Sequence, residues 1–181
     1  MKYLKLIFII VLISNEINAK IIDGVGLNLG MNHGLGDLSS HLKTGFQANL
    51  FAETGKIGFI QGECNFGLMY LEKKNDPEIH LLMVPITFLF VYTMQDLLHM
   101  DKFEPVFKAG MGVVPQKLTI SDHSIINNID PALTLAVGLE RYVTKRISVF
   151  MQASFLYIIQ KHLPVAYYNG NFLSVSMGII I

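Results

Sequence analysis

The amino-acid sequence predicts an all-β fold, an eight-stranded antiparallel up-and-down transmembrane β-barrel that follows a cleavable signal peptide. Three observations carry this prediction: a long two-residue alternation, a low content of charge, and an apolar N-terminal segment with a basic start. The alternation is clearest over residues 24–32 and 172–181, where apolar side chains take every second position and mostly Gly, Asn or Ser stand between them. A period of two residues puts one set of side chains on each face of a strand.

Composition favours a membrane protein over a soluble one. Hydrophobic residues make up 51% of the chain and charged residues 15%, against about 25% charged in an ordinary soluble domain. The 181 residues give room for one domain, and the formal net charge of +0 with scattered basic residues excludes nucleic acid as a partner. The single cysteine, Cys64, rules out an intramolecular disulfide and falls on the apolar face of its strand.

The first 19 residues have the organisation of a secretion signal. Lys2 and Lys5 form a basic start, residues 6–13 are apolar, and cleavage is expected between Ala19 and Lys20. The alternative is an N-terminal membrane anchor, but eight apolar residues fall short of the roughly 20 that a spanning helix needs. The mature barrel is therefore expected to cover residues 20–181.

The alternation divides the mature chain into eight strands. Several exceed the usual five or six residues and match the roughly 9–11 that cross a bilayer at a tilt. Their expected ranges are 21–32, 43–53, 57–71, 79–92, 102–114, 131–142, 146–160 and 171–181.

The connections also fit a membrane barrel. Tight turns at 53–56 and 143–146 follow the second and sixth strands, whereas longer polar links follow the odd-numbered strands. Short turns at one end and long loops at the other are typical of outer-membrane barrels, although the link at 93–101 is longer than this rule expects. The predicted loops are 33–42, 72–78, 115–130 and 161–170.

The fourth strand is the least regular. Residues 79–94 are almost continuously apolar, so a short membrane helix is the alternative interpretation. Pro85 would break the interior of such a helix. In a sheet it cannot donate to the ladder, which predicts a bulge or an irregular rung.

The contents of the two faces indicate which one looks outward. In the third strand, bulky residues such as Phe66 and Leu68 alternate with Gln61, Glu63 and Asn65. A soluble barrel, the alternative, needs charged residues outside and bulky apolar ones inside, whereas this pattern suits lipid outside and a narrow polar lumen inside. The seventh strand departs from it, with Phe150, Leu156 and Ile158 on the inner side. Four tyrosines fall near strand ends, where they suit the headgroup boundary: Tyr70, Tyr92, Tyr142 and Tyr157.

Four charged residues are predicted to project into the lumen: Glu63, Glu104, Lys108 and Glu140. Buried charges are costly unless they are paired, so we expect Lys108 to pair with Glu104 or Glu140. The favoured interpretation is a salt-bridged structural plug, and the alternative is a small ion path or gate.

The chain offers little for catalysis. Asp122, His123 and Ser124 form the only local cluster that resembles a nucleophile with its base, but adjacent residues on an extended segment point apart. The six histidines show no helical metal-site spacing. We therefore predict no catalytic residue, no cofactor and no metal site.

Several segments resemble the small bacterial outer-membrane β-barrels grouped as porin-family or OmpA-like transmembrane barrels. The matching segments are 82–86, 104–112, 136–142, the turn Lys145-Arg146 and the closing strand 173–181. The resemblance implies a place in the bacterial outer membrane and folding by the barrel assembly machinery. Members commonly end in an aromatic residue, whereas this chain ends in Ile181.

These observations predict an integral outer-membrane protein with a non-enzymatic structural or surface-interaction role. Its expected partners are outer-membrane lipid, the assembly machinery and an extracellular ligand at the loops, of which the largest, 115–130, is the first place to look. A small passive channel and a lipid-modifying enzyme are the two alternatives.

Overall fold

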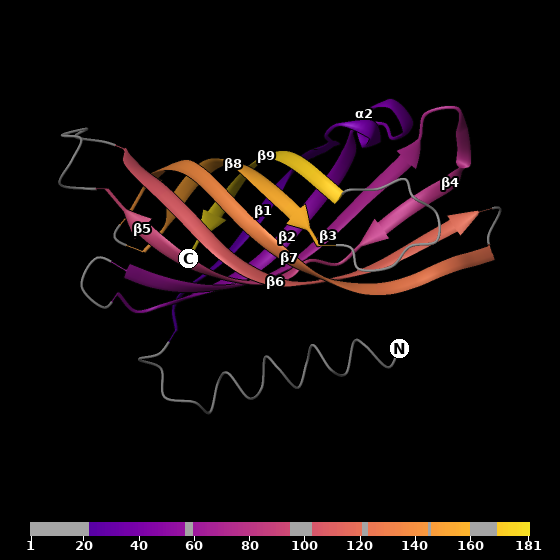
Figure 1. The fold of residues 1–181 in the computed structure, drawn as a ribbon. Coiled ribbons are helices and arrows are strands. Elements are labelled where there is room, and N and C mark those ends of the chain that lie inside the picture. The colour runs from indigo at the N-terminus through magenta and orange to yellow at the C-terminus, as the bar shows by residue number, and fades with distance from the viewer. Residues whose placement is uncertain (1–21, 57–59, 95–102, 121–122, 145, 160–169) are drawn as a thin grey trace.

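The computed structural model describes residues 22–56, 60–94, 103–120, 123–144, 146–159 and 170–181, which form a closed antiparallel β-barrel (Figure 1). The predicted signal peptide 1–19 and its cleavage site at Ala19 and Lys20 lie outside the described residues.

Nine strands and one short helix make up the described chain. Each strand pairs antiparallel with its sequence neighbours, except that β4 and β5 lie end to end and share β3 and β6 as neighbours. Pairing of β9 with β1 closes the barrel, so the predicted eight-stranded up-and-down barrel is confirmed. The elements are β1 (Ile22–Gly34), α2 (Asp37–His41), β2 (Gly45–Thr54), β3 (Ile60–Lys73), β4 (Asp76–Met83), β5 (Ile86–Thr93), β6 (Glu104–Ile120), β7 (His123–Tyr142), β8 (Ser148–Ile158) and β9 (Gly170–Ile180).

Pro85 separates β4 from β5 without shifting the register. Against β3, Met83 faces Met69 and Ile86 faces Phe66, so two residues lie between the paired positions on both strands. The ladder to β6 is equally continuous. Pro85 therefore makes an irregular rung and no bulge, and the alternative of a membrane helix over 79–94 is wrong. None of the helices in the described residues is long and apolar enough to cross a membrane.

The outer face of the barrel is apolar and the inner face is largely polar. On β1, Leu27 is 47% exposed while its neighbour Asn28 is 2% exposed. Cys64 is exposed on the outer face of β3, and Phe150, Leu156 and Ile158 point inward as the sequence predicts. A soluble protein has apolar residues inside and polar residues outside. This barrel has the opposite distribution, which suits a barrel surrounded by lipid.

An apolar cluster closes one end of the barrel. Leu38 of α2 and the nearby Leu42 are 1% and 4% exposed, and they pack with Leu71, Val114 and Phe172 among others. A helix of five residues is too short to be stable alone, so burial of these leucines holds α2 in place. We call this the loop end, because α2 and the hairpins β3–β4 and β6–β7 gather there (Figure 1); the opposite, terminal end carries Ile22 and Ile181.

Two predicted loops at this end are mostly strand. The β3–β4 turn falls between Lys73 and Asp76, and β6 and β7 stay paired as far as Ile120 and His123. The predictions of loops at 72–78 and 115–130 are therefore wrong, because polar residues such as Gln116 and Asn128 were taken as loop although they pair across a hairpin. The loop at 33–42 holds α2, and the loop at 161–170 lies outside the described residues except for Gly170.

Candidate functional site: a paired charge cluster in the lumen

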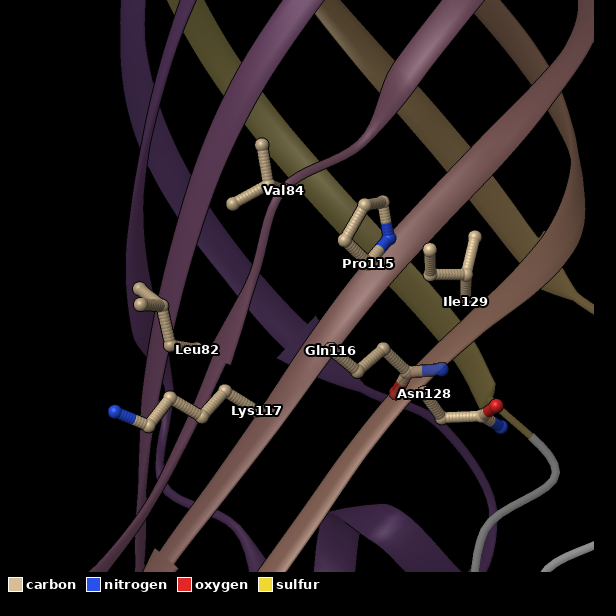
Figure 2. Close-up of a pocket in the computed structure, with 7 residues that line it drawn as sticks. All are labelled: Leu82, Val84, Pro115, Gln116, Lys117, Asn128 and Ile129. Carbon is tan, nitrogen blue, oxygen red and sulfur yellow. The ribbon is translucent and has the colours of Figure 1, made fainter. Parts of the chain in front are cut away.

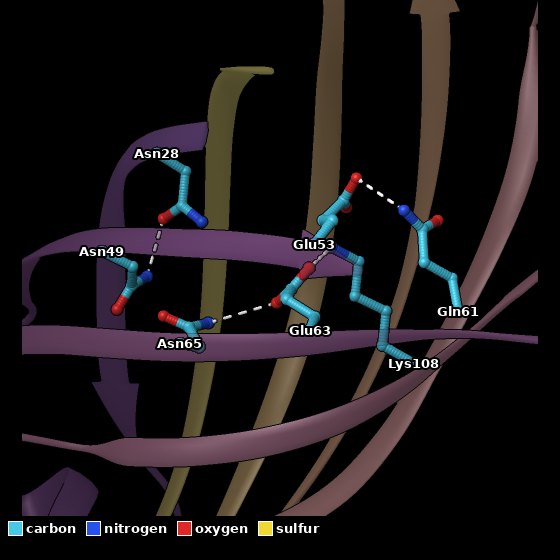
Figure 3. Close-up of polar contacts among 7 residues, drawn as sticks. All are labelled: Asn28, Asn49, Glu53, Gln61, Glu63, Asn65 and Lys108. Atoms are coloured by element: carbon cyan, nitrogen blue, oxygen red, sulfur yellow. Dashed lines mark hydrogen bonds and ion pairs between the residues drawn. The ribbon is translucent and has the colours of Figure 1, made fainter. Parts of the chain in front are cut away.

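Two buried side chains of opposite charge meet near the terminal end of the barrel. Lys108 Nζ lies 2.5 Å from Glu63 Oε2, and the two side chains are only 8% and 2% exposed. Lys108 belongs to β6 and Glu63 to β3, with β5 between them in the sheet. The lysine therefore reaches along the inner wall past one strand to its partner (Figure 3).

Polar neighbours complete the bonding of this pair. Asn65 Nδ2 donates to Glu63 Oε1 at 3.5 Å, and Gln61 Nε2 donates to Glu53 Oε2 at 3.2 Å. Glu53 and Glu63 face each other across β2 and β3. Because Lys108 is paired with Glu63 and also attracts Glu53, it offsets the repulsion that two buried anions would otherwise exert on each other.

Two phenylalanines flank the ammonium group. Phe51 and Phe150 contact each other edge to face at 5.6 Å, and Lys108 Nζ lies 5.1 Å and 5.3 Å from their ring centroids. At these distances each ring attracts the cation electrostatically. The rings also exclude water from the ion pair.

The phenylalanines were not predicted as part of the site, although the sequence carries a signal for them. Gly26 lies opposite Phe51 in the neighbouring strand, and Gly178 lies opposite Phe150. A Cβ atom on either glycine would collide with the facing ring. A glycine opposite an inward aromatic residue thus marks a position where the ring lies over the neighbouring strand.

The structure pairs the predicted lumen charges differently from our expectation. Lys108 makes its ion pair with Glu63, whereas Glu104 or Glu140 was the expected partner. The register explains the difference, because Glu104 and Glu140 lie opposite each other and Lys108 lies opposite Ala136. The lysine side chain then extends toward β3, where Glu63 is enclosed.

Other inward polar side chains bond to one another. Asn49 Nδ2 donates to Asn28 Oδ1 at 2.6 Å in the middle of the barrel. Nearer the loop end, Gln116 and Asn128 donate to the buried Asp130 at 2.8 Å and 2.9 Å. Many polar side chains of the described lumen therefore bond to one another, whereas others, such as those of Gln152 and Ser176, keep a buried oxygen without a hydrogen-bond partner.

The barrel is similar to several solved outer-membrane proteins, although no protein-family model and no curated protein matches the sequence. Neisserial surface protein A superposes with a TM-score of 0.67 at 12% identity, over 87% of this chain and 95% of that one. OprG from Pseudomonas aeruginosa gives 0.55 at 11% identity, over 89% and 97%. Ail, the attachment invasion locus protein of Yersinia pestis, gives 0.51 at 10% identity, over 88% and 99%. The chain has the fold of the small outer-membrane β-barrels.

Of the catalytic candidate formed by Asp122, His123 and Ser124, the structure describes the main chain of the last two residues. His123 and Ser124 lie in β7, where their main chains face Ile120 and Thr119 of β6, and Asp122 lies outside the described residues. Across the described residues, no group of three or more His, Cys, Asp and Glu side chains could hold a metal ion. Among the described residues, the best-formed site is the cluster around Lys108 and Glu63, in which opposite charges compensate each other.

Proposed function

We propose that the protein is an integral outer-membrane barrel with a closed interior, which acts by surface contacts at its loop end and carries no enzymatic activity. The observation that carries this proposal is that side chains fill the interior at both ends. An eight-stranded barrel is just wide enough inside for side chains to fill. The interior residues therefore stabilise the barrel, and a partner binds at its exterior.

Passage of an ion would require two separate rearrangements. Near the terminal end it would have to displace the Lys108–Glu63 pair and the rings of Phe51 and Phe150 beside Lys108. At the loop end it would have to move Leu38 and the apolar cluster around it. Both steps expose buried groups, which supports a structural barrel over a passive channel.

Side-chain contacts hold the loop end in one shape, as a binding surface requires. Lys43 Nζ pairs with Glu72 at 3.2 Å, and Lys74 Nζ donates to the Ser39 carbonyl at 2.6 Å. These contacts tie the segment around α2 to the β3–β4 hairpin. The neighbouring β6–β7 hairpin is paired along both its strands up to its turn, so it presents a shaped surface instead of a mobile loop.

Planar-bilayer recording tests the closed interior. The purified barrel is expected to give no discrete conductance steps, because the bore is filled. Steps that change size in the Lys108→Ala or Glu63→Gln variant would contradict the proposal and favour the channel.

Cell fractionation and surface labelling test the location. A peptide epitope inserted in the turn between Ile120 and His123 should be accessible to antibody on intact cells, and the protein should fractionate with the outer membrane. Epitope exposure only after lysis would contradict a surface role.

Lipid mass profiles test for enzymatic activity. They should be the same in cells that express the native chain, His123→Ala or Ser124→Ala. A change in lipid masses that either variant abolishes would indicate a lipid-modifying enzyme.

A further inference from the structure

The outer wall of the barrel carries a shallow groove of about 390 Å³ where β4, β6 and β7 lie side by side (Figure 2). Its apolar lining consists of Leu82, Val84, Pro115 and Ile129, and Lys117 stands at its edge. The remaining lining residues, Gln116 and Asn128, turn their side chains toward Asp130 inside the barrel.

Alternation along the strands places this groove on the lipid side. In Figure 2 the side chains of Leu82 and Lys117 point away from those of Gln116 and Asn128. Ile129 is 66% exposed, as expected for an outward position.

The groove crosses the expected boundary between lipid chains and headgroups. Tyr70, Leu82 and Lys117 lie on one rung across β3, β4 and β6. An outward tyrosine marks the headgroup level in membrane proteins. The next outward rung toward the middle of the barrel joins Val84, Pro115 and Ile129 and is wholly apolar.

Lys117 brings an uncompensated positive charge to this boundary. Its side chain is exposed, and among the described residues it makes no ion pair. Lys43, another lysine at the loop end, is instead paired with Glu72. A cation above an apolar groove complements a ligand that has an anionic head and a hydrocarbon chain.

We propose that this groove binds an anionic phospholipid, with one acyl chain along Val84, Pro115 and Ile129 and the phosphate at Lys117 Nζ. The inference rests on the proposed function, because it requires the barrel to lie in a membrane. Apolar contact with the chain and attraction of the phosphate act together at this position. The groove therefore selects lipids by the charge of their headgroup.

Lipid retention by the folded barrel tests the proposal. The protein is extracted from nanodiscs that contain phosphatidylglycerol and phosphatidylcholine in equal amounts, and the lipids that remain bound are counted by native mass spectrometry. We expect phosphatidylglycerol to be retained about fivefold over phosphatidylcholine, the preference that one lysine near an anionic lipid provides. Lys117→Gln should abolish the preference, while Lys117→Arg and the matched control Lys43→Gln should keep it.

A variant that fills the groove tests independently whether the groove holds the acyl chain. Val84→Trp should lower retention of both lipids although Lys117 is intact. Equal retention of the two lipids by the native chain, or equal effects of Lys117→Gln and Lys43→Gln, would mean non-selective annular lipid only and would overturn the proposal. A heat-dependent gel shift reports folding separately, so a folded barrel without selectivity overturns this inference alone, whereas failure to insert in nanodiscs overturns the proposed function as well.

Discussion

Lys108 takes part in two kinds of interaction in the lumen, an ion pair and contacts with aromatic rings. It is paired with the buried Glu63 and lies against the faces of Phe51 and Phe150. Removing charges from water is unfavourable, and the pair persists because its members compensate each other. The consequence is asymmetric: loss of one partner leaves the other buried and uncompensated.

Substitution of Lys108 should therefore destabilise the barrel strongly. Lys108→Ala is expected to lower the free energy of unfolding by about 3–5 kcal/mol, measured by urea titration in detergent micelles. The matched control Lys43→Ala removes an exposed pair with Glu72 and should cost less than about 1 kcal/mol. Equal losses in the two variants would show that the lumen pair is not buried as described.

Gly26 should be intolerant of a larger side chain because it faces Phe51. Gly26→Val is expected to cost about 1–3 kcal/mol of unfolding free energy by overpacking. In a Phe51→Ala background the same change should cost distinctly less, because the ring is gone. A double-mutant cycle with no coupling between the two sites would argue against the contact.

The short helix α2 is the element whose role depends most on a single side chain. Leu38 is enclosed by the apolar cluster, while its neighbour Ser39 is only partly buried and bonds to the Gly36 carbonyl. Leu38→Ala should cost about 2–5 kcal/mol, seen as a lower temperature for the heat-dependent gel shift. Ser39→Ala serves as the control and should shift that temperature little; a similar small shift for Leu38→Ala would mean that α2 does not plug the barrel.

The interruption between β4 and β5 comes from one missing donor. Gly67 donates to the Pro85 carbonyl at 2.7 Å, and in an antiparallel pair the two residues of such a rung normally exchange both bonds. Pro85→Ala should add the second bond, so the new amide at position 85 should exchange slowly with solvent deuterium by NMR. Exchange at the rate of an unfolded chain would contradict the continuous register across this position.

The strands could be predicted because lipid and lumen impose opposite chemistry on alternate residues. Segments such as β1 and β9 carry that alternation along their whole length, and their ladder pairs outward residues with outward residues. The same reasoning failed beyond Val114, because the hairpin there has polar residues on β6 and β7 that pair with each other. Helix α2 was missed because Leu38 and Leu42 are isolated apolar residues, whose burial depends on strands distant in the sequence.

The alternation predicted which residues belong to the lumen site, but it did not predict which of them pair with each other. Glu63 and Lys108 were recognised as inward residues, since both follow the period of their strands. Which carboxylate meets the lysine depends on the relative register of β3, β5 and β6 and on the reach of a long side chain. At the scale of the whole molecule, the sequence therefore predicts which side a residue faces better than it predicts its neighbour.

The central claim, that the apolar face of a closed barrel meets lipid, is tested most directly at Cys64. This residue is the chain's single cysteine and is exposed on the outer face of β3. A spin label on Cys64 in reconstituted vesicles should collide far more often with lipid-soluble oxygen than with a water-soluble nickel chelate. The control, Val143→Cys in a Cys64→Ser background, places the label at an exposed position just beyond β7 and should show the reverse. A Cys64 label as accessible to the chelate as that control would contradict the account, because the apolar face would then lie in water.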